Sequence, residues 1–175
     1  KCFPGPADQR QRGLEITRRA VHGEAMRLSE SPRVAIIGAG ALGLYYGARL
    51  ARAGADVRFL LRRDLEAVRA RGTLEVRENG GNWTVAAGTV GATTAELGPV
   101  DVVLVALKAT ANGTLPDLLP PLLEAHTRVV TLQNGLGNEE QLAAVVGRER
   151  TFGALCFIGV NRVGPGALQG FHTPG

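Results

Sequence analysis

Cysteine, histidine, aromatic residues and long hydrophobic runs are all scarce in this sequence of 175 residues. Its two cysteines, Cys2 and Cys156, are far apart, so the sequence contains neither a disulfide framework nor a cysteine-based metal motif. Cys156 lies in an apolar run, where we expect a buried free thiol. The three histidines share no spacing with acidic residues or cysteines, and we therefore predict no metal site.

The same scarcities argue against membranes, secretion and nucleic acids. The longest apolar runs have only the length of a strand, and the first residues lack the charged and then apolar pattern of a secretory signal. A net charge of +4 with 5% aromatic residues does not provide the dense basic face, interleaved with aromatics, that binds nucleic acid. The sequence also has no nucleophile elbow and no P-loop lysine motif. We predict a cytoplasmic protein with no membrane or nucleic-acid partner.

Residues 1–30 differ from the rest of the chain. They are polar and lack sustained periodicity, which predicts a disordered extension, with one folded domain over residues 31–175. Met26 is a candidate native start. Asp8, Glu15 and Glu24 argue against an organelle-import leader, because such leaders are poor in acidic residues.

Glycine, in contrast, is abundant, and three glycines form the pattern G-x-G-x-x-G directly after the apolar run Val34–Ile37. That run is typical of a buried parallel strand, and residues 41–53, followed by Gly54, are typical of a helix. In this context the first glycine permits a tight turn, the second lets the backbone approach a diphosphate, and the third allows close packing of helix on strand. The helix N-terminus adds free N–H groups and the positive end of its dipole. The predicted dinucleotide-binding residues are Gly38, Ala39, Gly40, Ala41, Leu42 and Gly43.

Strand and helix patterns alternate along the remaining sequence. We predict strands over residues 56–61, 101–107 and 128–132, and helices over residues 64–71 and 139–146. A further helical stretch, over residues 115–125, is interrupted by Pro116, Pro120 and Pro121. Two short strand-like pieces, 73–77 and 83–87, predict an inserted hairpin, and residues 152–160 and 167–172 predict an antiparallel hairpin at a sheet edge. The predicted fold class is α/β: a Rossmann-like, doubly wound, mostly parallel sheet with an inserted hairpin and an antiparallel C-terminal edge.

Arg62 is a candidate for choosing between the two nicotinamide cofactors, because ligands of open α/β sheets bind at the carboxyl ends of the strands. It follows the second predicted strand, where NAD enzymes keep an acid for the ribose 2′-hydroxyl. A guanidinium there binds a 2′-phosphate instead, which favours NADP. Two alternatives stay open. Asp64 lies only two positions further on and would favour NAD, and Arg62 and Arg63 are also what a solvated helix start would carry.

Lys108 and Asn134 follow two further predicted strands. Lys108 ends an apolar run, where an ammonium group needs an anion or hydrogen-bond acceptors unless its side chain reaches water. It is a candidate for contacting a nicotinamide ribose or a substrate carboxylate. Asn134 offers an amide able to orient a ribose or a nicotinamide, although asparagine is also common in turns.

With these residues in place, the sequence from Arg33 to Gly175 resembles the ketopantoate reductase (2-dehydropantoate 2-reductase) family. The resemblance rests on an ordered set of motifs: Ile37–Gly43, the arginine after the second strand, Leu107-Lys108-Ala109, and Leu132–Gly137. The first motif is common to many dehydrogenases, and the ordered set is far more specific.

The resemblance implies a cofactor site and a reaction. The glycine turn would hold the NADPH pyrophosphate, Arg62 the 2′-phosphate, and Lys108 and Asn134 the nicotinamide half, with Lys108 also in a supporting catalytic role. Gly159 would lie beside the cofactor. The reaction would be hydride transfer from NADPH to the ketone carbon of 2-dehydropantoate, a 2-oxo acid, giving pantoate for pantothenate and coenzyme A synthesis.

The resemblance also implies a missing part. Family members continue into a helical domain that carries the catalytic lysine and most substrate contacts, and these 175 residues have no counterpart of it. We therefore expect this chain to bind NADPH but to reduce 2-dehydropantoate poorly, and to expose apolar surface that favours a homodimer or aggregation. Two other functions stay open: a reductase of another 2-oxo acid or a related β-hydroxyacid dehydrogenase, and a non-catalytic NADP(H)-binding module.

Overall fold

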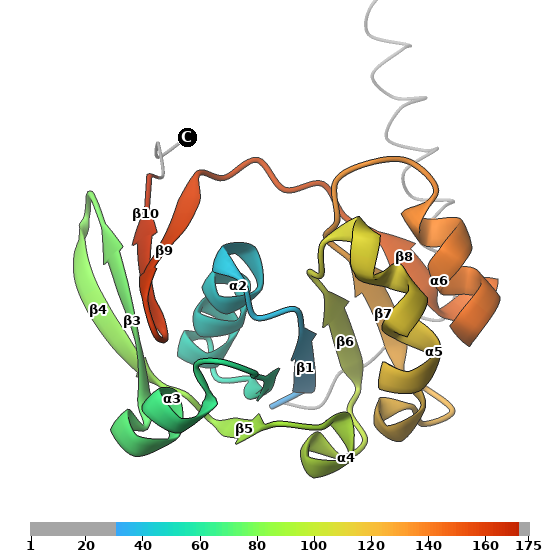
Figure 1. Ribbon diagram of the computed structural model, residues 1–175, viewed down its shortest axis with the longest axis horizontal. Helices are drawn as coiled ribbons and strands as arrows, with labels where there is room; N and C mark the ends of the chain where they lie inside the picture. The colour runs from blue at the N-terminus through green and yellow to red at the C-terminus, as the bar shows by residue number, and fades with distance from the viewer. Residues whose placement is uncertain (1–30, 172–175) are drawn as a thin grey trace, which may run out of the picture.

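The computed structural model describes residues 31–171, so the extension predicted for residues 1–30 lies outside the described residues. The chain forms two sheets with helices packed around them (Figure 1). The larger sheet contains β1 (Arg33–Ile37), β2 (Asp56–Leu60), β5 (Thr89–Gly91), β6 (Val102–Val105), β7 (Arg128–Thr131) and β8 (Thr151–Gly153). The smaller sheet contains β3 (Thr73–Glu78), β4 (Gly81–Ala86), β9 (Val160–Gly164) and β10 (Ala167–Gly170). The α-helices are α2 (Ala41–Arg52), α3 (Leu65–Arg71), α4 (Thr94–Leu97), α5 (Leu115–Leu118) and α6 (Asn138–Val146), and the 3₁₀ helices are η1 (Ala109–Thr114), η2 (Pro120–Leu122) and η3 (Arg148–Arg150).

The larger sheet has the strand order β5-β2-β1-β6-β7-β8, and every neighbouring pair in it is parallel. After β1, the next strands of this sheet, β2 and β5, lie on one side of β1. The later strands, β6, β7 and β8, lie on its other side. This reversal between β1 and β6 defines a doubly wound sheet and confirms the predicted fold class.

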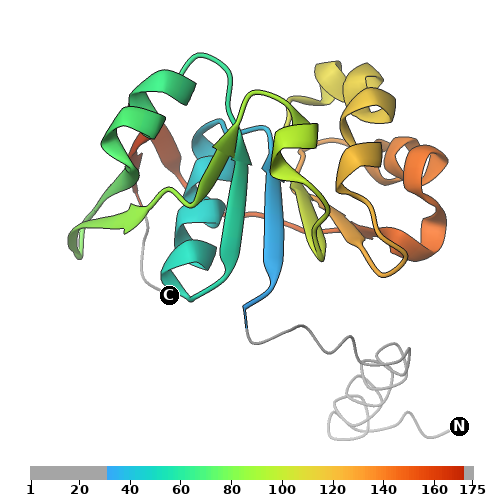
Figure 2. The same ribbon diagram turned by 90° about the horizontal axis from the view of Figure 1, so that it is seen from below.

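Helix α2 lies between the two sheets, as Figure 1 shows, and Figure 2 shows it packed against β1 and β2 from another side. Strand β1 serves both faces of the larger sheet because its side chains alternate. Val34 and Ile36 pack with α2 and the smaller sheet, whereas Ala35 and Ile37 pack with the cluster formed by α4, α5 and α6. Among residues 31–171, no helix is long and apolar enough to span a bilayer.

The position of the C-terminal hairpin differs from the prediction. Strands β9 and β10 are antiparallel, as predicted, but β10 pairs in parallel with β3, so the hairpin completes the smaller sheet instead of extending the larger one. The reason is burial. Leu168 of β10 is fully buried in the same apolar cluster as Leu74 and Val76 of β3.

The prediction of one strand over residues 152–160 is wrong. Strand β8 ends at Gly153, and residues 154–159 form no regular structure before β9 begins at Val160. Leu155 and Phe157 are 89% and 91% exposed, and Cys156 is half-buried, so this apolar run is not a buried strand and the expectation of a buried thiol fails.

As predicted, prolines interrupt the helical stretch over residues 115–125. Pro116 lies in the first turn of α5, and Pro120 and Pro121 begin η2, because proline has no N–H group to continue a helix. Helix α4, in contrast, was not predicted. Its start is a capping box in which the Thr93 hydroxyl accepts a hydrogen bond from the Glu96 backbone, while the Glu96 carboxylate accepts one from the Thr93 backbone.

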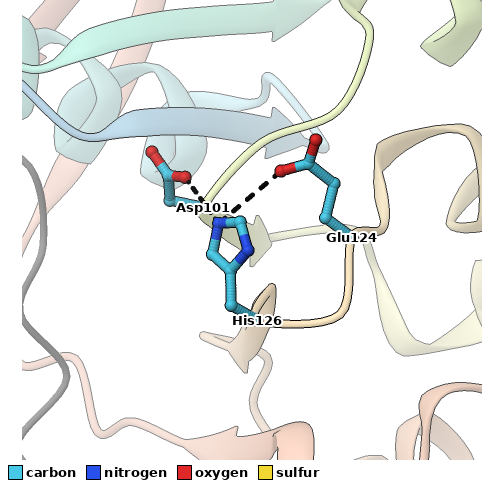
Figure 3. Close-up of side chains that lie close together, drawn as sticks. All are labelled: Asp101, Glu124 and His126. Atoms are coloured by element: carbon cyan, nitrogen blue, oxygen red, sulfur yellow. Dashed lines mark hydrogen bonds and ion pairs between the residues drawn. The ribbon is translucent and has the colours of Figure 1, made fainter.

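At the amino ends of β1, β6 and β7, an ionic cluster joins three segments of the chain. Asp101, Glu124 and His126 point toward one another (Figure 3), and the Oδ1 atom of Asp101 lies 2.9 Å from Nε2 of His126. Nη2 of Arg33 donates to that same oxygen at 2.7 Å and to Oε2 of Glu124 at 2.8 Å. The guanidinium therefore takes the position that a metal ion bound by these oxygens would need.

These hydrogen bonds, those from Arg33 first, hold the pKa of Asp101 well below its usual range. We expect Asp101→Asn to destabilise the chain by about 1–3 kcal/mol at neutral pH, because the charge-assisted hydrogen bonds to Arg33 are weakened. A depressed folded-state pKa stabilises the fold above the unfolded pKa of about 4, and this contribution is lost as the pH falls below it. Urea unfolding from pH 7 to pH 2 should therefore show the difference between the two proteins shrinking with acid.

Glu75→Gln is the matched control, because Glu75 pairs with Arg77 in a more exposed ion pair of the smaller sheet. The loss of this pair should cost much less stability than the loss of the Asp101 charge, because exposed ion pairs contribute little. A constant difference between Asp101→Asn and the unsubstituted chain across this pH range would contradict the role assigned to the Asp101 charge.

Candidate functional site

An open cleft of about 630 Å³ lies at the carboxyl ends of β1, β2 and β6. Its position is the point where the strand order reverses, since the chain leaves β1 and β6 toward opposite faces of the sheet. The size is that of a small-molecule site. The cleft is lined by Gly38, Ala39, Gly40, Leu60, Leu61, Arg62, Arg63, Asp64, Ala106, Leu107, Lys108, Thr110, Ala111 and Arg162.

The three glycines of the turn meet different steric demands. Gly38 has a φ of +101°, and a Cβ atom there would overlap the peptide that joins Ala106 to Leu107. A Cβ atom on Gly43 would overlap the carbonyl oxygen of Gly38, so this glycine lets α2 pack onto the turn. Gly40, in contrast, has no atom within 4 Å of a Cβ position and borders the cleft. The α2 N-terminus next to it has no side-chain cap, so its backbone N–H groups are free to bind an anion. This open space therefore suits the approach of a diphosphate.

Four cationic side chains and one carboxylate line the cleft. Arg62 and Arg63 follow β2, are exposed, and have no hydrogen-bond or ion-pair partner for their side chains within residues 31–171. Lys108 follows β6 and is likewise exposed and unpaired in that part of the chain. Unpaired cations that line a cleft favour an anionic ligand.

Asp64 is not available in the same way. Its side chain is only 6% exposed, and its Oδ2 atom lies 3.2 Å from Nη1 of Arg162. The backbone N–H of Gly166 donates to the same oxygen at 3.3 Å. The carboxylate is therefore turned away from the solvent and occupied by the C-terminal hairpin.

Asn134 does not line the cleft. It is exposed in the loop after β7, and its carbonyl oxygen accepts a hydrogen bond from the Asn138 side chain at 3.2 Å. The residue before it, Gln133, points inward. Its amide donates to the carbonyl oxygen of Leu107 at 3.0 Å and to the side chain of Asn112 at 2.6 Å, which ties the loop after β7 to the loop that carries Lys108.

The predicted site residues thus divide into three groups. Gly38, Ala39, Gly40, Arg62 and Lys108 meet at the cleft. The residues Ala41, Leu42 and Gly43 form the first turn of α2, and Asn134 and Gly159 lie outside the lining. Gly159 instead accepts a hydrogen bond from the Phe171 N–H at 2.7 Å. The prediction missed Arg162, which a local motif could not reveal because its partner Asp64 is distant in sequence, and it missed Gln133 as a buried contact.

The reversal of the sheet, the glycine turn and the cationic cleft together define a Rossmann-like domain of the dehydrogenase type. The chain belongs to the ketopantoate reductase PanE/ApbA family, whose sequence model matches residues 34–173. A 2-dehydropantoate 2-reductase of Nostoc sp. is 46% identical over 137 residues, which are 78% of this chain and 43% of that protein.

Solved structures agree with this assignment. The crystal structure of 2-dehydropantoate 2-reductase from Geobacter metallireducens superposes with a TM-score of 0.77 at 49% identity, covering 81% of this chain and 46% of that one. D-mandelate dehydrogenase, solved with NADH and anilino(oxo)acetate, superposes with a TM-score of 0.71 over 81% of this chain and 46% of that one; at 24% identity this likeness concerns the fold alone. The chain spans less than half the length of the Nostoc and Geobacter relatives.

The steric roles of the glycines can be separated by two alanine variants. Gly43→Ala should destabilise the chain by about 1–3 kcal/mol, because its methyl group overlaps the Gly38 carbonyl oxygen and must displace α2. Gly40→Ala should change stability by less than about 1 kcal/mol, since its φ of −76° suits alanine and its Cβ meets open space. Thermal unfolding followed by circular dichroism measures both, and equal losses would contradict this division.

Proposed function

We propose that this chain is the NADPH-binding part of an enzyme that reduces 2-dehydropantoate to pantoate, with residues 31–175 as its NADP-binding domain. The observation that carries the proposal is the cationic cleft at the strand reversal, in which the glycine turn after β1 lies between Arg62 and Arg63 after β2 and Lys108 after β6. Family membership supports the reaction, and the Nostoc and Geobacter relatives are 2-dehydropantoate 2-reductases.

NADP is favoured over NAD by the charges around the adenosine end of the cleft. Arg62 and Arg63 are unpaired among the described residues and can bind a 2′-phosphate through charge-assisted hydrogen bonds. Asp64, the residue that would favour NAD, is buried against Arg162 and is poorly placed to accept a bond from a ribose hydroxyl.

In this proposal the chain binds and orients, and NADPH when bound supplies the hydride that reduces the ketone carbon of the substrate. The backbone around Gly40 and the α2 N-terminus bind the diphosphate, and Arg62 binds the 2′-phosphate. Lys108 follows the carboxyl end of β6, where the Gln133 side chain holds the preceding residue, Leu107. From there it stabilises the nicotinamide half or a substrate carboxylate. Asn134 and Gly159 do not line the cleft, so their proposed roles require a bound cofactor that extends beyond the lining residues to reach them.

A fluorescence titration of the purified chain with NADPH and with NADH tests the cofactor. We expect tighter binding of NADPH, and Arg62→Ala should weaken it about tenfold or more while leaving NADH binding nearly unchanged, because only NADPH carries the 2′-phosphate.

The matched control is Arg148→Ala, which removes another exposed arginine that does not line the cleft. It should leave both affinities unchanged. Preference for NADH in the unsubstituted chain would contradict the NADP assignment, and binding of neither dinucleotide would contradict the proposed site.

The division of labour has its own test. Because the relatives are about twice as long, we expect the chain of 175 residues to bind NADPH yet to reduce 2-dehydropantoate at a small fraction of the rate of a full-length relative assayed beside it. A steady-state assay of NADPH oxidation measures this. Full turnover by this chain alone would overturn the proposal that it lacks part of the catalytic machinery.

A further inference from the structure

We propose that Arg162, on strand β9 of the C-terminal hairpin, is a determinant of the preference for NADPH over NADH. The inference rests on the proposed cofactor site and adds to it a residue from outside the nucleotide-binding strands. Arg162 is one of the four cations that line the cleft, and it is the only one of them that the smaller sheet supplies.

The Asp64 carboxylate lies where it could oppose a bound 2′-phosphate. Asp64 comes two positions after Arg62, at the end of the cleft where the adenosine ribose is proposed to lie. An unpaired carboxylate there would accept a hydrogen bond from the 2′-hydroxyl of NADH and would repel the 2′-phosphate of NADPH. The ion pair with Arg162 at 3.2 Å and the hydrogen bond from the Gly166 backbone occupy this carboxylate and offset its charge.

The Arg162 guanidinium has hydrogen-bond donors that Asp64 does not use. Nη1 of Arg162 contacts Asp64, but the side chain remains 34% exposed at the cleft, and a guanidinium has five N–H donors in a planar fork. One edge can therefore hold Asp64 while another meets an anion. Asp64 fixes the position of Arg162, and Arg162 prevents Asp64 from opposing the phosphate.

The test compares the ratio of the NADPH and NADH dissociation constants in the unsubstituted chain, Arg162→Ala, Arg162→Lys and Asp64→Asn. For Arg162→Ala we expect the preference for NADPH to fall about tenfold or more, because NADPH binds more weakly and NADH binds as well as before or better. Arg162→Lys keeps the charge and should retain part of the preference. Asp64→Asn loses the ion pair that positions Arg162 but keeps the Arg162 charge and removes the opposing carboxylate, so it should retain most of the preference.

Arg162→Ala leaves Asp64 buried without its partner and could unfold the chain. The double variant Asp64→Asn with Arg162→Ala removes both charges and keeps the test decisive, since the preference should still fall several-fold. Arg77→Ala is the matched control, because Arg77 also pairs with a carboxylate in the smaller sheet but does not line the cleft.

Two failures are distinguishable. If the unsubstituted chain shows no preference for NADPH, the proposed cofactor fails before Arg162 is tested. If it does prefer NADPH, but Arg162→Ala and the double variant weaken both dinucleotides equally or leave the ratio unchanged within twofold, Arg162 has only a structural role and this inference is overturned.

Discussion

The close contact between Gly38 and the peptide that joins Ala106 to Leu107 is the constraint on which the cleft depends. It brings the ends of β1 and β6 together at the point where the strand order reverses. No side chain larger than hydrogen fits between them. The turn then directs α2 to one face of the sheet while the loop after β6 runs to the other. The opening that remains between these departing segments is the cleft, so a single steric contact fixes both its position and its shape.

A second layer of organisation surrounds this contact. Helix α2 is covered on one side by the larger sheet and on the other by the smaller one, and the two apolar clusters meet along alternate side chains of β1. The smaller sheet is therefore more than an appendage, since it closes the core over α2 and also delivers Arg162 to the rim of the cleft. At the opposite ends of the same strands, Arg33 holds Asp101 and Glu124. The arginines at the two ends of the sheet thus differ: they are paired within the fold at one end and partly unpaired beside the cleft at the other.

The parts of this arrangement that the sequence predicted are those encoded within a few residues. The glycine turn, the strand before it, and the placement of Arg62 and Lys108 after strands follow from local patterns, because the carboxyl ends of parallel strands share one edge. The parallel pairing of β10 with β3, the ion pair of Asp64 with Arg162, and the contact of Gln133 with Asn112 join segments far apart in the chain, and no local signal reports them. The interruption of the helical stretch over residues 115–125 could be predicted from its three prolines, and the missed α4 had a local signal in its capping box.

The pairing of β10 with β3 also bears on the order in which the molecule can be assembled. Gly166 and Asp64 are separated by 102 positions, so the contact between them must wait until almost all of the described chain has left the ribosome. The hairpin of β3 and β4 is by then already synthesised, with an unpaired strand edge exposed to other nascent chains. Closure of that edge and the contact of Asp64 with the C-terminal hairpin therefore belong to the same late step, so a chain stalled before it would keep an aggregation-prone strand edge exposed.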